Sequence, residues 1–195
     1  AFNRVLHALH HEEQRVRRTV DVESDSDVDD ASDEHVFVDF VALSNALAKM
    51  LPSESSTLFL YALLNTAPHY VEFLASSNVL QILICSSLKG LYSVGRSSTA
   101  AGNDAHSQTF VDSLYIMVIN VLCLVQRSSI RQSLSSIQVS PRWYLEHAVI
   151  GISLADLTLL CTLRCTVYAL FKLTDKYLLQ NCFAILLDLA PAVEG

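Results

Sequence analysis

Glycine and proline are scarce in this sequence: five glycines and four prolines occur among 195 residues. An all-β protein needs frequent turns, and turns draw heavily on these two residue types. Charge is scarce as well, since 17% of the residues are charged and 51% are hydrophobic. The shortage of turn residues argues against an all-β fold, and the apolar content is ample for a sizeable core.

Negative charge is concentrated in one part of the chain. The net charge is −7, and eight of the 20 acidic residues lie in residues 21–34, where no basic residue occurs. The rest of the chain has 13 basic and 12 acidic residues, a net charge of +1. This balance lacks the basic surface that binds nucleic acid, so we expect no nucleic-acid partner. Residues 19–35 cannot bury enough apolar area to offset chain entropy, which predicts a disordered linker.

Two serines in this acidic linker are candidate phosphorylation sites. Ser24 and Ser26 each have an aspartate three positions later, Asp27 and Asp29, and such a pattern suits an acidophilic kinase. Each phosphate would add a charge of about −1.5 to −2. The alternative is that the acidic run only keeps the protein soluble.

The sequence also lacks a long apolar run without charge. A helix that spans a bilayer needs roughly 20 such residues, and the longest charge-free stretch is Ser55–Val71. The most apolar region, 147–173, contains Asp156 and Arg164, each of which costs about 2.5–3.5 kcal/mol at the bilayer centre. Residues 1–18 have no apolar signal-peptide core. We therefore expect a cytoplasmic protein without a transmembrane span, despite a mean hydropathy of +0.35.

Apolar residues recur at helical spacing along most of the chain. Pro52 ends one expected helix, Ser53 or Ser55 caps the next, Thr174 caps the last, and Pro191 ends it. Between two of these helices, residues without an apolar period are expected to form a mobile surface loop at 93–108. The expected helices are 1–18 (short and amphipathic), 36–51, 53–66, 69–74, 78–91, 109–126, 127–137, 144–152, 154–173 and 175–189.

Such a series of helices with short turns forms either a bundle or a stack of helical pairs. The stack is favoured because residues 154–173 are apolar on nearly every side, as expected for a helix between two neighbours. We therefore predict an all-α, armadillo/HEAT-like helical-pair solenoid fragment over residues 36–192. The chain is too apolar to cover its own ends, so we also expect an exposed apolar end face and self-association.

Motifs for catalysis and phosphate binding are missing. The sequence has neither a G-x-S-x-G elbow nor a G-x-x-x-x-G-K-[ST] loop, which predicts a non-enzymatic protein without a cofactor. Cys161 and Cys165 share a helix face, and Cys182 and His147 are further candidate zinc ligands, but zinc sites favour polar surroundings near turns. Because the thiols alternate with apolar residues, we expect buried, reduced cysteines and no metal.

Asp156 and Arg164 are charged residues within the most apolar expected helix. Buried charges are usually paired or hydrogen-bonded. The two residues lie about 80° apart around the helix axis and need not pair with each other. We expect each to bond a neighbouring helix and so to set the packing register, with partner binding as the alternative.

The last third of the chain carries a family resemblance. Its residues are Trp143, Tyr144, Glu146, Arg164, Asp175, Lys176, Tyr177, Asn181 and Cys182. This pattern resembles the dymeclin family, most specifically in the run D-K-Y-L-x-x-N-C that begins at Asp175. The resemblance covers about residues 36–192. Members of that family are longer, so it implies that this chain corresponds to a central or C-terminal-side part.

The resemblance implies a helical-repeat protein that associates peripherally with the Golgi apparatus through regions outside this sequence. It further implies a role in Golgi organisation and intracellular vesicle traffic, Golgi-associated protein partners and no catalysis. The nine residues are expected to be structural: Asp175 and Lys176 begin a helix, and Tyr177, Leu178 and Cys182 fill its inner face. The alternative function is a generic armadillo-like adaptor in transport or signalling outside the Golgi.

Overall fold

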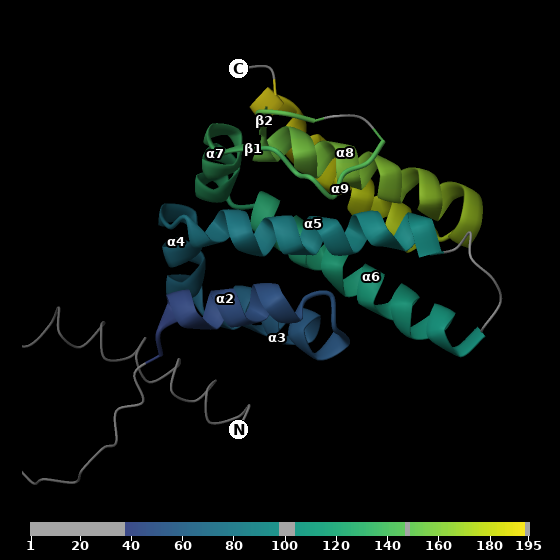
Figure 1. Cartoon of the computed structure of the whole chain (residues 1–195), viewed down its shortest axis with the longest axis horizontal. Helices are drawn as coiled ribbons and strands as arrows, with labels where there is room; N and C mark the ends of the chain where they lie inside the picture. Colours follow the sequence, from purple (N-terminus) through teal and green to yellow (C-terminus); the bar gives the residue numbers. More distant parts are fainter. Residues whose placement is uncertain (1–37, 98–103, 147–148, 194–195) are drawn as a thin grey trace, which may run out of the picture.

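The computed structural model of the chain describes residues 38–97, 104–146 and 149–193 (Figure 1). These residues are mostly helical, which confirms the all-α prediction. The two short strands form one antiparallel pair, with Gln138 opposite Ser153. The elements are α2 (Phe40–Met50), α3 (Glu54–Thr66), α4 (Pro68–Ser76), α5 (Val79–Ser97), α6 (Asp104–Val125), α7 (Ser128–Ser136), β1 (Gln138–Val139), β2 (Ile152–Ser153), α8 (Leu154–Tyr168), the π-helix η1 (Ala169–Leu173) and α9 (Lys176–Val193).

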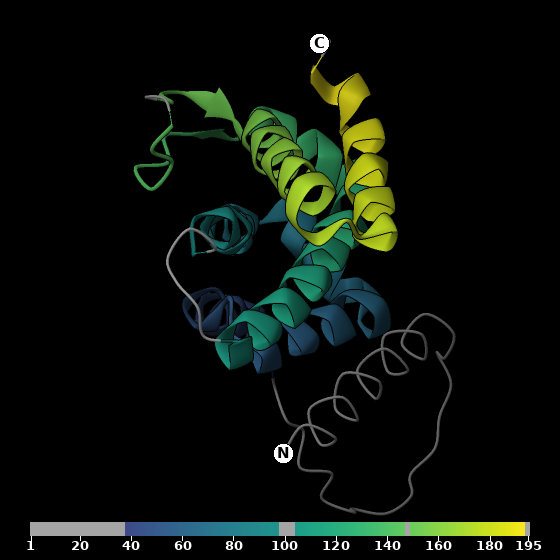
Figure 2. The ribbon, with the colours of Figure 1, turned by 90° about the vertical axis from the view of Figure 1, so that its right-hand side faces the viewer.

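Six of these helices form three layers of two, seen one above another in Figure 2. We call α2–α3 the first pair, α5–α6 the middle pair and α8–α9, with η1, the last pair. Helix α5 packs against both α2 and α8, and α6 packs against both α3 and α9. Figure 1 shows α2, α5 and α8 running in one direction and α3, α6 and α9 returning in the other. The short helices α4 and α7 pack against each other at the end of the layers where α3 and α6 finish.

The core lies between the layers, and leucine that recurs at helical spacing is its commonest residue. Two hydrogen bonds add polar links to it: Asn120 Nδ2 of α6 donates to the Thr57 carbonyl of α3 at 2.9 Å, and the hydroxyls of Ser44 and Tyr70 lie 2.8 Å apart. Fully buried polar groups are tolerated when they are paired in this way. The largest fully buried side chains are Tyr70, Leu60, Leu63, Leu74, Leu80, Leu83, Ile84, Leu88, Leu114, Met117, Leu124 and Ile130.

The prediction of a helix at 144–152 is wrong. The described residues between α7 and α8 form the strand pair and irregular chain instead. Tyr144 is buried against α5, whereas Leu145 and Ile150 are exposed, and Gly151 has a left-handed φ of 60°. Tertiary contacts of aromatic side chains therefore outweigh the weak helical preference of this segment.

Three other boundaries also differ from expectation. The loop predicted at 93–108 is shorter, because α5 continues to Ser97 and α6 already begins at Asp104; residues 98–103 lie outside the described part. Pro191 does not end α9, which continues to Val193. The proline lies in the last turn, where the helix loses only one backbone hydrogen bond.

Some predictions fall outside the described residues. These are the amphipathic helix at 1–18 and the acidic linker at 19–35 with its two serines, Ser24 and Ser26. The phosphorylation hypothesis therefore stays a prediction.

Candidate functional site

Four of the nine resemblance residues meet around Arg164 of α8. The guanidinium carbon of Arg164 lies 4.6 Å from the centre of the Tyr92 ring of α5, and Arg164 Nη1 forms an ion pair with Glu146. The ring centres of Trp143 and Tyr144 lie 5.6 and 5.0 Å from that of Tyr92. We call these five residues the arginine cluster. It joins α5, α8 and the connection between α7 and α8.

Two hydrogen bonds also link residues around the arginine cluster, while Arg164 Nε is buried without a hydrogen-bond partner. The Tyr144 hydroxyl donates to Glu146 Oε2 at 3.2 Å, and the Leu145 amide donates to the Tyr92 hydroxyl at 3.1 Å. Burial is the largest influence on the Tyr144 hydroxyl and raises its pKa, while the charge of Arg164 acts in the opposite sense. The charge of Arg164 is thus paired within the chain, and the cluster is suited to holding the α7–α8 connection in place.

The two charged residues of α8, Asp156 and Arg164, have different kinds of partner in the structure. Arg164 contacts a neighbouring helix through Tyr92, as expected. The expectation for Asp156 is wrong, because it bonds the start of its own helix: its amide donates to Ser153 Oγ at 3.0 Å, and Ser153 Oγ donates to Asp156 Oδ2 at 2.7 Å. This reciprocal pattern is a helix cap. Tyr92 was missed by sequence reasoning, since nothing in the local pattern of α5 distinguishes it from a core residue.

The start of α9 is capped by Asp175, not by Thr174 as predicted. Asp175 Oδ1 accepts a hydrogen bond from the Leu178 amide at 2.8 Å, while Thr174 takes a left-handed φ of 50°. The Asp175 carboxylate also accepts a hydrogen bond from the Tyr115 hydroxyl of α6, and these bonds lower its pKa. Asp175 therefore both begins α9 and ties it to the middle pair.

The other resemblance residues of α9 divide between its two sides. Leu178 and Cys182 are buried, as predicted, but Tyr177 is 60% exposed, so its assignment to the inner face is wrong. Each residue turns the helix by about 100°, which takes Tyr177 away from the side shared by Leu178 and Cys182. Lys176 is exposed as well, and the side-chain nitrogen of Asn181 is buried without a hydrogen-bond partner.

The cysteines are free thiols. Cys161, Cys165 and Cys182 are buried as predicted, and the Cys182 thiol donates to Cys165 Sγ at 3.9 Å. Burial raises the pKa of Cys161 to about 12, so it is protonated at neutral pH and is a poor metal ligand or nucleophile. Across the described residues, no three His, Cys, Asp or Glu side chains are grouped so that they could hold a metal ion; His147 lies outside that part.

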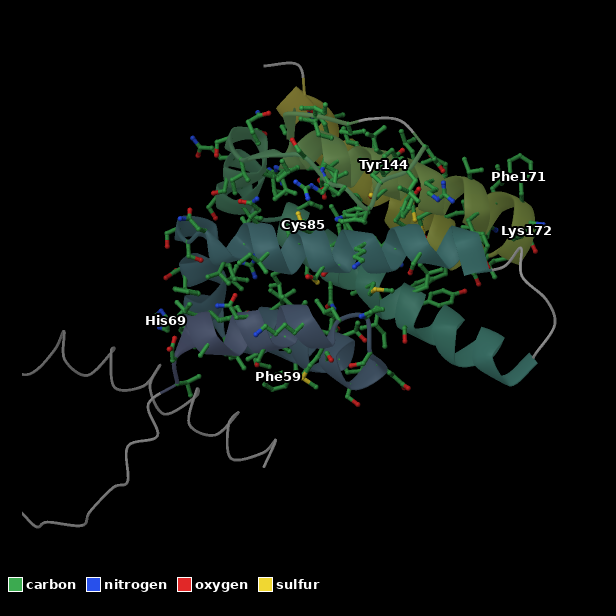
Figure 3. The ribbon with its side chains drawn as sticks, viewed as in Figure 1. Phe59, His69, Cys85, Tyr144, Phe171 and Lys172 are labelled. Carbon is green, nitrogen blue, oxygen red and sulfur yellow. The ribbon has the colours of Figure 1, made fainter. Side chains whose placement is uncertain are left out.

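The side of the last pair that faces away from the core is apolar. We call it the outer face of the last pair. Phe171 and Leu187 are the most exposed of its residues, at 73% and 74%, and Figure 3 shows Phe171 and Lys172 at the end of the pair where α8–η1 turns into α9. The expected apolar end face is therefore present. Its residues are Leu160, Leu163, Val167, Leu170, Phe171, Tyr177, Phe183 and Leu187.

Part of this face belongs to a segment that could cross a membrane by length and composition. Leu154–Leu173 is 20 residues long with a mean hydropathy of 1.5 in its most apolar window, half of which is buried. Two bent helix pairs, 68–93 and 113–136, pass the same test when each is taken as one span, so the described residues offer one such segment or up to three. Because Leu154–Leu173 contains Arg164 and one side of α8 packs against α5 and α9, the absence of a span stays our prediction.

Comparison with known proteins identifies a family model that matches the whole chain and relatives that match most of it. A family model described as "Dymeclin: Dyggve-Melchior-Clausen syndrome protein" matches residues 1–195. Dymeclin from Drosophila pseudoobscura pseudoobscura is 27% identical over 154 residues, covering 78% of this chain and 20% of that protein. For Dymeclin from Gallus gallus the identity is 28% over 168 residues, covering 85% and 23%. The chain thus spans about a fifth of the length of these curated relatives. No solved structure matches it.

Proposed function

Because the chain belongs to the dymeclin family, we propose that it is part of a non-enzymatic helical scaffold in Golgi organisation and intracellular membrane traffic. In this proposal the protein is cytoplasmic and peripheral on the Golgi apparatus, and its partners are other Golgi-associated proteins. The fold of the scaffold is an armadillo/HEAT-like solenoid of helical pairs.

The observation that carries the proposal is the repeated stacking of the pairs. The middle pair packs between the first and last pairs, with α5 against α2 and α8 and with α6 against α3 and α9. Corresponding helices run in the same direction (Figure 1). Solenoids are built in this way, with each pair contacting only its neighbours and the stack presenting long surfaces for protein partners.

The chemistry of the resemblance residues supports a scaffold as well. The charge of Arg164 is paired with Glu146, and the carboxylate of Asp175 caps α9. An active site needs a nucleophile, base or acid that is free to meet a substrate. The side chains of Arg164 and Asp175 instead bond other parts of the chain, as residues that hold helices together do.

Localisation of the tagged protein in cells tests the proposal. We expect a signal that coincides with a Golgi marker and disperses when the Golgi is chemically disrupted. A nuclear or diffuse signal that is insensitive to this disruption would contradict the proposal and favour an adaptor acting elsewhere.

Extraction of isolated membranes separates peripheral association from insertion. An alkaline carbonate wash releases peripheral proteins and leaves helices that span the bilayer in the pellet. We expect release, because Asp156 and Arg164 make Leu154–Leu173 costly to insert. Retention in the pellet would show that this segment spans the membrane.

A further inference from the structure

Two cysteines from different helices meet inside the last pair. Cys165 lies on α8 and Cys182 lies on α9, 17 residues further along the chain, and their Sγ atoms are 3.9 Å apart. Both side chains are buried and both thiols are free. The sulfur atoms of a disulfide are about 2.05 Å apart. The two thiols are therefore in contact, and an approach of about 2 Å, shared between two side chains, would bring them to bonding distance.

The chain between the two cysteines forms one connection. Helix α8 continues into η1, Thr174 takes its left-handed φ of 50°, and α9 begins at Lys176. Figure 1 shows α9 returning alongside α8, and the two helices pack against each other. A bond between the two sulfurs would therefore join neighbouring helices across this connection. Such a cross-link restricts the unfolded chain and so stabilises the folded pair.

The hydrogen bond between the two thiols makes them chemically unequal. It raises the pKa of Cys165 and lowers that of Cys182, because the Cys165 thiol can donate its proton to a thiolate at Cys182. Burial opposes the ionisation of both groups. Cys182 is therefore the first of the two to become a thiolate, which is the form of cysteine that attacks an oxidant or a disulfide.

Cys161 provides a comparison within the same helix. It is fully buried on α8, one helical turn before Cys165, and burial raises its pKa to about 12. The thiol–thiol hydrogen bond between α8 and α9 is made by Cys165, not by Cys161. A chemical reaction that depends on two adjoining sulfurs should therefore select Cys165 and Cys182.

We propose that Cys165 and Cys182 form a reversible disulfide when the protein meets a peroxide, and that this bond locks α8 to α9. With hydrogen peroxide, the Cys182 thiolate attacks one oxygen: an S–O bond forms, the O–O bond breaks, and the leaving hydroxide takes up a proton and departs as water. The Cys165 sulfur then attacks the resulting sulfenic acid. The S–S bond forms, and the sulfenic hydroxyl leaves with the Cys165 proton as a second water. The two thiols are oxidised and the peroxide is reduced.

Access to the pair requires local opening of the last pair. Cys165 is 4% exposed and Cys182 is 0% exposed, so the folded protein should react more slowly than a free thiol. Hydrogen peroxide is nearly as small as water, and the last pair lies at one end of the stack (Figure 2). In a reducing compartment, a disulfide of this kind is typically transient and responds to oxidant. The inference does not depend on the proposed Golgi function.

Tryptic digestion separates all the cysteines of this chain, so mass spectrometry can identify the bonded pair. Cleavage after lysine and arginine places each cysteine on a different peptide, because Arg164, Lys172 and Lys176 lie between or beside the cysteines of the last pair. The peptides are 50–89 with Cys85, 97–127 with Cys123, 143–164 with Cys161, 165–172 with Cys165 and 177–195 with Cys182.

The experiment treats the folded protein with hydrogen peroxide, then blocks the remaining thiols in denaturant and digests the protein. We expect a cross-link between peptides 165–172 and 177–195, with the loss of two hydrogens, and its removal by dithiothreitol. The oxidised protein should also have a higher Tm than the reduced protein. These readouts come from the wild-type chain and do not depend on the folding of a variant.

Two serine variants provide the controls. Cys182→Ser should form no cross-link, and peroxide should not raise its Tm; because it keeps the exposed Met50, it also accounts for methionine oxidation. Cys161→Ser removes a buried thiol from the same helix and should form the cross-link as the wild type does. Circular dichroism should match the wild type for both variants.

Three outcomes would overturn the proposal. The first is that both thiols of the folded wild type stay free after prolonged treatment with peroxide. The second is a cross-link that joins Cys161 to Cys85 instead. The third is oxidation of Cys182 to a sulfinic acid without bonding to Cys165, which would show that the two sulfurs cannot reach each other.

Discussion

The first and last helical pairs pack against the same middle pair, yet their outer sides differ. On the first pair, exposed apolar residues alternate with Lys49, Glu54 and Asn65. On the last pair, apolar residues continue along both helices, and the exposed charges are confined to the turn. A pair that ends a stack needs a polar outer side for solubility, whereas a pair inside a stack is apolar on both sides. The last pair has the composition of an internal layer, and the first pair is closer to a terminal one.

The two pairs are also anchored to the middle pair by different polar contacts. The first pair uses a neutral hydrogen bond, from Asn120 to the Thr57 carbonyl. The last pair uses charged groups: Arg164 over the Tyr92 ring and Asp175 with the Tyr115 hydroxyl. Because hydrogen bonds to charged groups are stronger than neutral ones, the last pair should depend more on its polar anchors.

The largest expected effect comes from the apolar contacts that both pairs share with the middle pair. Leu60→Ala in α3 and Ile185→Ala in α9 each remove a fully buried side chain and should lower the free energy of unfolding by about 2–5 kcal/mol. Chemical denaturation measures this change. The exposed neighbours give the control, since Leu58→Gln and Leu187→Gln should change it by less than about 0.5 kcal/mol.

One transition that shifts as a whole in both core variants would show that both pairs unfold together with the middle pair. A variant that shifts only part of the transition would show instead that its pair unfolds separately. That second outcome would break the comparison, because the two pairs would no longer be equivalent layers of one stack.

The arginine cluster should give the next largest effect. Arg164→Met removes the ion-pair partner of Glu146 and the cation from the Tyr92 ring, so we expect the free energy of unfolding to fall by about 1–3 kcal/mol. Trp143, the single tryptophan of the chain, lies in the cluster, and its fluorescence emission should shift to longer wavelength as the α7–α8 connection loosens.

Asn120→Leu makes the matching change at the first pair. The side-chain oxygen of Asn120 is buried without a hydrogen-bond partner. Replacing the side-chain amide by an apolar group therefore also removes an unfavourable buried atom. We expect the free energy of unfolding to fall by about 1 kcal/mol or less. If Asn120→Leu cost more than Arg164→Met, the order of anchor strengths proposed for the two pairs would be reversed.

Two serines at helix starts, one in the last pair and one in the first, give a smaller effect. Ser153 accepts a hydrogen bond from the Asp156 amide at the start of α8, whereas Ser53 at the start of α3 makes no such bond to the backbone. Thermal unfolding should therefore show a loss of about 1 kcal/mol for Ser153→Ala and a few tenths for Ser53→Ala. Similar losses for the two variants would mean that the hydrogen bond at Ser153 does not stabilise α8.

The smallest effect concerns pH. The pKa of Asp175 in the folded protein is lowered from its ordinary value of 3.8 by bonds from Tyr115 and the α9 backbone. Its ionised form therefore adds stability that is present above about pH 3.8 and is lost as pH falls through the folded-state pKa. Asp175→Asn keeps a good capping side chain but does not titrate. The wild type should be more stable than this variant at neutral pH, and the difference should shrink in acid.

Tyr115→Phe provides the control for the pH prediction. It removes the largest cause of the lowered pKa, so the contribution of Asp175 should be smaller and should disappear at a higher pH than in the wild type. A stability difference between wild type and Asp175→Asn that does not change with pH would contradict the assigned role.

Long periodic helices were the part of the fold that could be predicted from sequence. The helix expected at 53–66 is observed as Glu54–Thr66, and the one expected at 154–173 is observed as α8 followed by η1. In such segments the apolar side and the breaking residues, such as Pro52, act over short distances. The same reasoning placed Leu178 and Cys182 correctly in the core.

The candidate site was less predictable, because its residues are far apart in the chain. Trp143 and Arg164 were singled out by resemblance, but their meeting point at Tyr92 of α5 depends on how three elements pack. For the same reason local spacing predicts a helix over 144–152 that is not formed. Its aromatic side chain, Tyr144, instead contacts Tyr92 of α5, which no local pattern reveals.

The sequence by itself determined that this protein is helical, that few turns interrupt it and that its apolar surface exceeds what its own helices can cover. These properties follow from composition and spacing, which act within one or two turns of a helix. Only the tertiary structure decided which helices form layers, where Arg164 and Asp175 find their partners and which sides of the first and last pairs stay exposed. Those outcomes depend on contacts between residues distant in sequence, whose energies local spacing does not encode.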